Sequence, residues 1–549
     1  MARRDASEAS LPPIPSQRIP HRRPPSSRVG MAIALTWMAV ASHAGPAQAS
    51  HLTVPDNVAT IQAAVDTRVD TVFVRSGTYP ETTTVVASAV LIGMEGDPTL
   101  ARPILAGLWC SPSDGLVPAV QVRNVDFAGQ VRVWEEGVGW SILFDDCRFM
   151  AGVVSSGDHG TPLTFHRSRI EGDARLTVDG PCVLDSCVVE GQLVLGNQDC
   201  WLTVTDCEFH GNGHGVAIGT PGSDLHSASI TGTLVEGYAS AIGISAITDV
   251  RIDRNQVRDC QGGISARGEW VHVAQNSVER SGGIWAEGIT LLVLENTVAH
   301  SSGTGIFAIM DVGGAISGNI VWAGGADGFF IGEGGADGSS VTNNTSCFNA
   351  GHGFVVSSPV PPQYEFTRNI GYRNGGYGIQ FVLPEAGAIR CNDWFANGLG
   401  DVQGIPSSAE DFSVNPLFCN AAGGDFGLAA NSELVDRPGC GRVGALDVGC
   451  AATVDVEQAR AFRLAGVGPN PARGRVRIDF QVGRESAIEI GVYDVQGRLV
   501  ASPARGVWPA GSHSVEWSGR TGGTQAAGLY LVRYRYPGGE HRRRLIRTP

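Results

Sequence analysis

The sequence predicts an all-β protein, in which a parallel β-helix solenoid of about thirteen coils is followed by a small β-sandwich. An Asn-led phrase returns seven times between Asn255 and Asn392, at intervals of 20 to 25 residues. Repetition at this period is typical of solenoids, in which each repeat buries its apolar face against its neighbours. Glycine accounts for 74 residues and charged residues for only 17%, which suits short strands joined by tight turns. After Val456 the repeats give way to alternating strands bounded by glycine.

Residues 1–49 are expected to be a disordered leader and signal peptide. An apolar run from Val29 to Ala44 follows a basic stretch that ends at Arg28, and a small-x-small motif ends at Ala49. The run is shorter than the ~20 apolar residues that a membrane-spanning helix needs. We therefore expect cleavage after Ala49, export of the chain, and no membrane span in the mature protein.

The segment Val54–Val65 is predicted to be an amphipathic helix. Asp56 and Asn57 are favourable helix caps, and apolar residues such as Ile61 and Val65 recur at helical spacing. A solenoid must cover the open end of its core, so this helix is expected to cap the first coil.

The recurring asparagines mark the same turn in successive coils: Asn255, Asn276, Asn296, Asn319, Asn344, Asn369 and Asn392. An Asn side chain tolerates the left-handed backbone conformation and can hydrogen-bond to the same residue of the next coil, so the column is expected to be scaffold. Degenerate positions extend the register upstream and bring the count to thirteen: Asn124, Asp146, Arg167, Ser186, Asp206 and Gly232. The Leu-x-x-Leu-x-Leu frame of leucine-rich repeats is missing, which favours a β-helix.

Several of these motifs are similar to those of a known family. Ile61–Val65 followed by Val74–Tyr79, together with the Asn column and the Gly-Ile coils, resembles the right-handed parallel β-helix, pectin-lyase-like family of secreted bacterial proteins with PbH1 repeats. The resemblance covers roughly residues 51–450, and Asn415–Leu446 resembles the closing cap of such proteins. The β-helix domain is therefore expected at residues 50–455. The family includes lyases, hydrolases, epimerases and adhesins, so the resemblance implies a fold and leaves the activity open.

Residues 456–549 are expected to form a second domain. Alternating stretches at residues 476–480, 487–493, 514–517 and 528–534 predict an immunoglobulin-like β-sandwich. Four phrases resemble the C-terminal sorting domains of type IX secretion and the related module of flagellar hook-assembly proteins: Pro469–Pro471, Tyr493–Leu499, Gly528–Val532 and Arg542–Arg547. This resemblance implies the secretion machinery as a partner and a secreted or cell-surface location. An ordinary accessory sandwich is the alternative.

The twelve cysteines fall into two groups of interest. Cys391, Cys419, Cys440 and Cys450 cluster near the end of the solenoid, and an exported chain can oxidise them, so we expect disulfides there with the pairing left open. Three others occupy the same place in successive repeats and are expected to be a stacked column of small residues without disulfides: Cys147, Cys187 and Cys207. No paired Cys-x-x-Cys spacing indicates zinc.

Charge separates the two domains and limits the partners. Residues 456–549 carry a net charge of +8 and residues 1–50 one of +4, so the total of −14 leaves −26 on residues 51–455. An acidic solenoid repels polyanions, which argues against nucleic acid and means that a polygalacturonate ligand would need bridging cations. The chain contains no lysine, which excludes a lysine base or Schiff base.

The glycine-led strands suggest where a ligand could bind. Because alternate strand residues face opposite sides, the residue after each inward Ile or Phe points outward. This rule gives one outward column: Ala217, Gly243, Ser265, Trp285, Phe307, Phe330, Val355 and Gln380. It places Trp285, Phe307 and Phe330 side by side with Arg267 nearby, and exposed aromatic stripes mark binding surfaces. A covering loop, or a phase error of one residue, is the alternative.

Glu287, Asp311 and Glu333 are the candidate catalytic carboxylates. Glycoside hydrolysis uses two carboxyl groups ~5 to 9.5 Å apart, and coils stacked ~4.8 Å apart could supply such a pair. The tripeptides around His214 and His352 invite comparison with polygalacturonases, but both fall in turns before glycine-led strands and are expected to be turn residues.

Two classes of function follow. The first is a secreted or surface protein that binds, and in one version cleaves as a lyase or hydrolase, a polysaccharide or cell-surface glycan along the aromatic residues. The second is a non-catalytic surface adhesin or structural rod. No cofactor is predicted, and calcium is left open because no motif indicates a site.

Overall fold

The computed structural model of the protein describes residues 51–94, 102–111, 119–135, 141–157, 162–196, 199–220, 224–332, 339–357, 365–382, 389–406, 408–452, 462–483, 486–509, 511–518, 527–536 and 539–548. The expected leader, residues 1–49, and the candidate carboxylate Glu333 lie outside these ranges.

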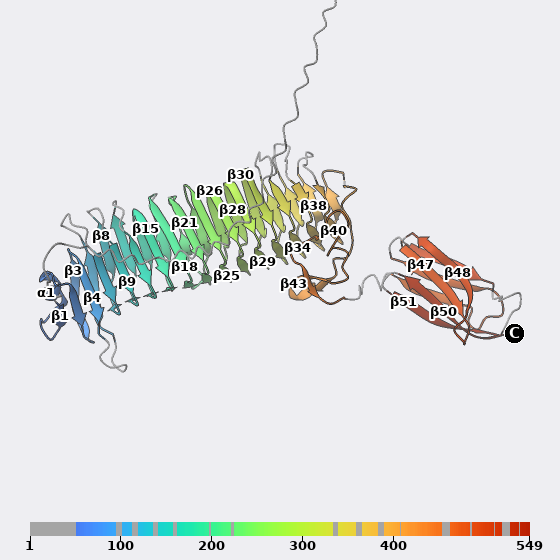
Figure 1. The fold of residues 1–549 in the computed structure, drawn as a ribbon, viewed down its shortest axis with the longest axis horizontal. Coiled ribbons are helices and arrows are strands. Elements are labelled where there is room, and N and C mark those ends of the chain that lie inside the picture. The colour runs from blue at the N-terminus through green and yellow to red at the C-terminus, as the bar shows by residue number, and fades with distance from the viewer. Residues whose placement is uncertain are drawn as a thin grey trace, which may run out of the picture. The chain divides into compact units, whose positions relative to one another are not determined.

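Strands β1 to β41 form one parallel β-solenoid, which confirms the predicted fold class (Figure 1). It has about sixteen turns, compared with the thirteen that the register residues predict. The additional turns lie largely before Asn124, where the strands β1 (His51–Val54) to β6 (Ala119–Arg123) pair without any recurring turn residue.

From β6 onward, each coil contributes one strand to each of three faces. The first face consists of β3 (Thr78–Val85), β5 (Ile104–Cys110), β8 (Val131–Glu135), β11 (Val153–Gly157), β14 (Ala174–Thr177), β17 (Leu193–Leu195), β20 (Val216–Gly219), β23 (Ser240–Ser245), the first halves of β26 (Ile264–Ala274), β28 (Ile284–Leu294) and β30 (Ile306–Ser317), β32 (Phe329–Ile331), β35 (Phe354–Val356), β38 (Tyr377–Phe381) and β41 (Gly400–Gln403).

The second face consists of β1, β2 (Thr71–Val74), β4 (Ala89–Gly93), β6, β9 (Ser141–Asp145), β12 (Leu163–His166), β15 (Gly180–Asp185), β18 (Cys200–Thr205), β21 (Ser227–Thr231), β24 (Asp249–Asp253), the second halves of β26, β28 and β30, β33 (Ser340–Thr342), β36 (Glu365–Thr367) and β39 (Ile389–Arg390). The third face consists of the short strands β7 (Asp126–Phe127), β10 (Arg148–Phe149), β13 (Arg169–Ile170), β16 (Val188–Val189), β19 (Glu208–His210), β22 (Leu234–Glu236), β25 (Gln256–Arg258), β27 (Ser277–Glu279), β29 (Thr297–Ala299), β31 (Ile320–Trp322), β34 (Thr345–Cys347), β37 (Ile370–Tyr372) and β40 (Asp393–Phe395).

Alternate strand residues fill the solenoid with one continuous apolar core. Val, Ile, Leu and Phe point inward, as in the fully buried rings of Phe127, Phe144, Phe149 and Phe165, which pack at centroid distances of 5.1 to 6.2 Å. The parallel register stacks like residues, so the core repeats along the axis.

The N-terminal helix is shorter than the predicted segment Val54–Val65. Helix α1 spans Ile61–Asp66, its N-cap is Thr60, and its buried residues, among them Ile61 and Val65, join the solenoid core. Asp56 instead pairs with Arg75 at 2.5 Å, so it does not cap the helix.

The asparagine column forms the expected ladder, with one correction to its backbone. The left-handed residue is the one before each ladder Asn, as at Arg254 (φ 56°) and Gln275 (φ 55°). The upstream positions Asn124 to Gly232 are also left-handed, so they align with Arg254 and the upstream register is one residue out of phase. The true upstream ladder positions follow them and include Cys147, Ser168, Cys187, Cys207 and Thr233.

The cysteine column is therefore part of this ladder. Cys147, Cys187 and Cys207 are free and buried, as predicted, and the backbone N–H of Cys187 donates to Cys207 Sγ at 3.3 Å. Burial raises the pKa of the Cys147 thiol to about 12, so it stays protonated.

A second amide ladder, which the repeat phrase did not reveal, joins Asn349, Asn374 and Asn397 at 3.0 Å per step.

The segment after β41 packs along the third face. It contains β42 (Phe418–Asn420), the 3₁₀ helix η1 (Ala421–Gly423), β43 (Asp425–Ala429) and β44 (Val448–Cys450), and its Phe426, Leu428 and Val443 pack against Ile320 and Ile370. Two disulfides fix it, Cys391–Cys440 and Cys419–Cys450, so all four cysteines of the predicted group are paired.

The C-terminal domain is an antiparallel sandwich with its own core. One sheet contains β45 (Arg463–Gly468), β46 (Val476–Val482) and β49 (Gly511–Trp517), and the other has the order β48 (Leu499–Trp508), β47 (Ser486–Tyr493), β50 (Gly528–Tyr536) and β51 (Gly539–Arg547). Its core includes Phe480, Val492, Trp517 and Tyr534. Strands β45, β48 and β51 were not among the predicted stretches.

Candidate functional site

Three aromatic residues lie side by side on the outer side of the first face. In the parallel register, Trp285 of β28 lies opposite Phe307 of β30, and Phe307 lies opposite Phe330 of β32. Their neighbours Ile284, Ile306 and Phe329 are buried, because the strand alternation sends them into the core. The inward and outward phase of these three coils is therefore the one that the sequence predicts. We call these three residues the aromatic strip.

The rings of the aromatic strip stack on one another. The centroids of Phe307 and Phe330 are 4.6 Å apart with an interplanar angle of 2°, and those of Trp285 and Phe307 are 6.4 Å apart at 16°. All three side chains are half-buried, so part of each ring surface remains open to solvent. The strip therefore presents a continuous apolar surface across three coils.

A groove of about 500 Å³ adjoins the strip on the side where the strands begin. It is lined in part by Trp285 and Phe307 and by turn glycines, among them Gly262, Gly263 and Gly283. A Cβ at Gly263 would lie 1.8 Å from the carbonyl oxygen of Gly283, so only glycine lets neighbouring turns approach this closely. These glycines were not among the predicted site residues, although the recurring Gly-Gly dipeptides before the strands are a signal in the sequence.

The predicted polar residues lie next to the strip, two positions along the strands. Arg267 lies opposite Glu287 in the register, and its Nε is 3.4 Å from Glu287 Oε1. Glu287 lies opposite Ile309, whereas Asp311 is exposed at the register shift that interrupts the pairing of β28 and β30. The structure thus brings Arg267 and Glu287 together and does not place Asp311 opposite Glu287.

One predicted member of the outward column is wrong. Ala217 is fully buried, and Gly219 lies opposite Gly243 in its place. In this coil two residues, Val216 and Ala217, separate the turn residue Gly215 from the inward Ile218, so the rule that the residue after the glycine points inward fails here.

The two turn histidines differ, since His214 is exposed in the turn before β20 and His352 has structural contacts. His352 Nδ1 accepts a hydrogen bond from the Tyr377 backbone N–H at 2.9 Å, its backbone N–H donates to Asp327 Oδ1 at 2.7 Å, and its ring stacks on Tyr377. The polygalacturonase motifs also include an Asp-Asp pair, and the adjacent Asp145 and Asp146 of this chain contact separate partners, since Asp145 contacts His166 at 3.0 Å and Asp146 contacts Arg102 at 2.8 Å.

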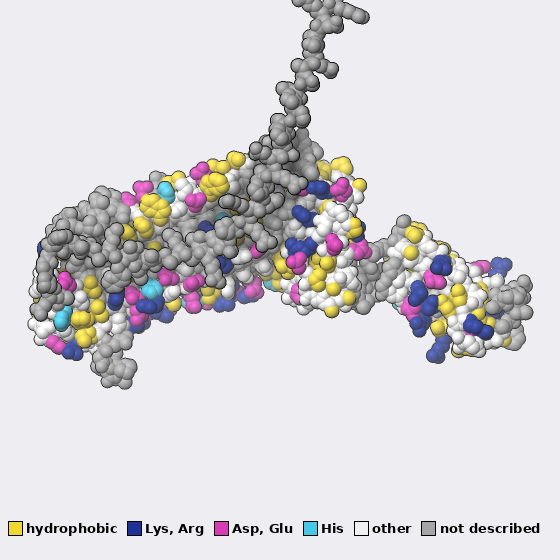
Figure 2. All heavy atoms as spheres, viewed as in Figure 1, with side chains coloured by type: hydrophobic (Ala, Val, Ile, Leu, Met, Phe, Trp, Pro, Cys, Tyr) yellow, Lys and Arg dark blue, Asp and Glu magenta, His cyan; other side chains and the backbone are white. Residues whose placement is uncertain are grey.

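The third face has a different surface chemistry. Ion pairs link successive coils, for example Arg148–Glu171 at 2.7 Å, Arg258–Glu236 at 2.6 Å and Arg280–Asp259 at 2.6 Å. Figure 2 shows the resulting mixture of acidic and basic side chains along the side of the solenoid near β25 and β29. Exposed pairs contribute little stability each, at most about 1 kcal/mol. Opposite charges satisfy one another on this face, whereas the first face presents aromatic rings.

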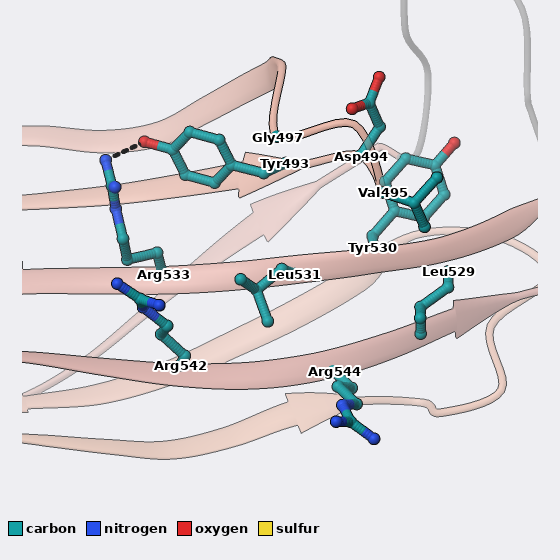
Figure 3. Close-up of a pocket in the computed structure, with 10 residues that line it drawn as sticks. All are labelled: Tyr493, Asp494, Val495, Gly497, Leu529, Tyr530, Leu531, Arg533, Arg542 and Arg544. Carbon is teal, nitrogen blue, oxygen red and sulfur yellow. Dashed lines mark hydrogen bonds between the residues drawn. The ribbon is translucent and has the colours of Figure 1, made fainter.

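A second groove of about 500 Å³ lies on the C-terminal domain (Figure 3). Arg533, Arg542 and Arg544 line it together with Leu529 and the turn after β47. The guanidinium of Arg533 lies over the Tyr493 ring at 4.4 Å and donates a hydrogen bond to the Tyr493 hydroxyl. This basic groove belongs to the domain whose sequence resembles a sorting signal.

Within the described ranges, no three His, Cys, Asp or Glu side chains are grouped so that they could hold a metal ion. Among these same residues there is also no helix of sufficient length and apolar character to cross a membrane.

Comparison with family models identifies both domains. Residues 192–345 and, in an overlapping match, 240–389 match the model described as a right-handed β-helix region. Residues 467–546 match the model of a secretion system C-terminal sorting domain. The search of curated proteins found no match.

Several solved structures are similar to this chain at low identity. The A-module of mannuronan C-5 epimerase from Azotobacter vinelandii is 13% identical, with a TM-score of 0.28 and coverage of 65% of this chain and 94% of that chain. Tailspike protein 3 of bacteriophage CBA120 is 11% identical, with a TM-score of 0.24 and coverage of 64% and 57%. A periplasmic alginate epimerase is 10% identical, with a TM-score of 0.21 and coverage of 63% and 76%.

Proposed function

Because the chain is a right-handed β-helix protein with a C-terminal sorting domain of type IX secretion, and is therefore secreted or displayed at the cell surface, we propose that it binds polysaccharide there through the aromatic strip. The observation that carries this proposal is the stack of Trp285, Phe307 and Phe330, half-exposed on three successive coils.

The chemistry of the strip suits a sugar polymer. An extended chain of sugar rings offers apolar ring faces at regular intervals, and aromatic faces bind such surfaces while hydroxyl groups stay solvated or hydrogen-bond at the edges. Arg267 and Glu287 supply charged hydrogen-bonding groups two positions along the same strands. The adjoining groove gives the sugar polymer a path past Trp285 and Phe307.

Affinity electrophoresis tests the proposal. Native gels that contain xylan, laminarin, alginate or polygalacturonate, with and without calcium, should retard the full-length protein on at least one polymer. The variants Trp285→Ala and Phe307→Ala should each lower the retardation at least tenfold on that polymer. The matched control is Trp270→Ala, because Trp270 is 56% exposed but belongs to the second face of a neighbouring coil.

Product assays separate binding from cleavage. Reducing ends or unsaturated products that disappear in Glu287→Gln, with retardation unchanged, would add a cleavage role for the carboxylate beside the strip. Retardation without products would favour a glycan-binding surface protein. If wild type and the two aromatic variants migrate identically in every gel, the aromatic strip is not a glycan site.

A further inference from the structure

The outward column that contains the aromatic strip continues along the first face toward the N-terminal coils. In register from the strip, it passes through these residues: Ser265, Gly243, Gly219, Val194, Arg175, Val154, Arg132 and Trp109. A single row on one sheet face therefore has aromatic residues at both ends.

Trp109 is not alone at its end of the row. Trp134 follows Arg132 by two residues on β8, so it points to the same side of the face and lies diagonally beside Trp109, with the two Cα atoms about 8 Å apart by strand geometry. The two indoles are 44% and 50% exposed. Exposed apolar side chains that lie next to one another mark interaction sites more often than single exposed side chains do.

The side chains of the row next to the aromatic strip, between its two ends, are small. Four successive coils carry Val194, Gly219, Gly243 and Ser265 in this row, and none of these side chains is larger than valine. A ligand that lies along the row therefore meets no large side chain of the row in these coils. Nearer Trp134, Arg132 and Arg175 are exposed and offer guanidinium donors to hydroxyl or carboxylate oxygens.

We propose that Trp109 and Trp134 form a second sugar-binding platform, and that one polysaccharide chain occupies both platforms by lying along the first face. Seven coil steps separate β8 from β28, which at ~4.8 Å per coil is about 34 Å. The proposal rests on the function proposed above and specifies its substrate class, which is an internal stretch of a long polysaccharide.

Two linked platforms on one surface make affinity depend on ligand length. A chain that reaches both platforms binds the second at a high effective concentration, and this can raise the overall affinity by 10² to 10⁴. A chain too short to reach both can use only one platform at a time. Length dependence is therefore the signature that separates a two-platform surface from a single aromatic site.

The test compares short and long forms of the polymer that retards the protein in the gels, chosen from xylan, laminarin, alginate and polygalacturonate. Isothermal titration of wild type should give at least tenfold tighter binding to the polymer than to oligosaccharides of about four units, with the polymer concentration counted in stretches of the length that one protein covers, so that the many binding positions on a long chain do not enter the comparison. The double variant Trp109→Ala/Trp134→Ala should lose this gain while it keeps the affinity for the short oligosaccharide. Trp285→Ala should weaken binding to both forms.

The controls distinguish the two proposals. Trp201→Ala removes another indole of 42% exposure from the second face and should leave the length dependence unchanged. Circular dichroism and thermal unfolding of the double variant should match wild type, because both indoles are exposed. If the length dependence survives in the double variant, the second platform is overturned and the aromatic strip stands. If no polymer binds wild type, both proposals fall together.

Discussion

Single side chains keep the solenoid in register through a buried amide ladder. From Asn255 to Asn392, each Nδ2 donates to the Oδ1 of the next ladder residue at 2.9 to 3.0 Å. The ladder ends on Asp411, whose Oδ1 accepts from Asn392 Nδ2 at 3.1 Å. A buried amide left without partners costs about 1–3 kcal/mol, so each step of the ladder disfavours any slip of one coil against the next. The ladder is therefore scaffold, and a ligand must bind elsewhere.

A buried carboxyl lies beside the end of this ladder, and we expect it to make the stability of the fold depend on pH. Asp393 is fully buried in β40, and its Oδ1 accepts from the Val414 backbone N–H at 2.8 Å, while its Oδ2 has no hydrogen-bond partner among the described residues. Burial raises the pKa of Asp393 well above the usual 3.8. Because the folded pKa lies above the unfolded one, the folded state holds the proton more tightly, and stability is lost as the pH rises above about 4.

The variant Asp393→Asn tests this. The amide keeps the acceptor for Val414 and cannot ionise, so at pH 7 the variant should unfold at a higher urea concentration than wild type. The gain should shrink toward zero as the pH falls below 4. Urea unfolding of both proteins at pH 4 and pH 7 measures the difference. A gain that is equal at both pH values would show that ionisation of Asp393 is not its cause.

At the level of strands and turns, the alternation of inward and outward strand residues was enough to predict the positions of the aromatic strip. The period of two and the Gly-led turns placed Trp285, Phe307 and Phe330 in one outward row, and the structure aligns them in that row. The rule failed at Ala217, because the distance from turn to strand varies between coils. The first coils and the Trp109–Trp134 pair were missed, because register there depends on pairing across coils rather than on a recurring residue.

The disulfide-bonded segment that follows β41 shows what a local pattern leaves out. Its sequence predicts a cap and oxidised cysteines, but no local signal states that it packs against the third face. Contacts between residues far apart in the sequence decide this. The Ala445 N–H donates to Thr345 Oγ1 at 3.0 Å, and the Gly444 N–H donates to the Arg368 carbonyl at 2.8 Å. These partners lie 100 and 76 residues away in the chain.

Removal of the Cys391–Cys440 disulfide should loosen this segment selectively. The bond closes a separation of 49 residues, so its loss in Cys391→Ser/Cys440→Ser should cost about 2–4 kcal/mol. Hydrogen exchange should become faster in residues 412–445 and on β37, while amides of β12 and β15 keep their protection. Wild type under a reductant loses Cys419–Cys450 as well, so it should show a change in the same region that is at least as large. Uniform loss of protection along the whole solenoid would contradict this expectation.

At the scale of the whole molecule, the chain combines two domains of opposite charge and separate cores. Residues 51–455 carry −26 and residues 456–549 carry +8. The residues of the sandwich core, such as Phe480 and Tyr534, form a cluster of their own, apart from the solenoid clusters. The proposed glycan-binding surface and the sorting domain thus belong to parts of the chain that have different cores.

This division predicts that removal of residues 453–549 leaves a folded solenoid that is no longer exported. The sorting domain is the part that the secretion machinery reads, whereas the solenoid buries its own apolar residues and keeps both of its disulfides without it. In a bacterial host with type IX secretion, full-length protein should reach the cell surface or the medium, and the truncated protein should accumulate in the periplasm. The purified truncated protein should retain a β-type circular dichroism spectrum, a cooperative thermal transition and the retardation on polysaccharide gels. Export of the truncated protein at the full-length level would show that the sorting signal lies in the solenoid, and loss of its thermal transition would show that the sandwich is needed for the solenoid to fold.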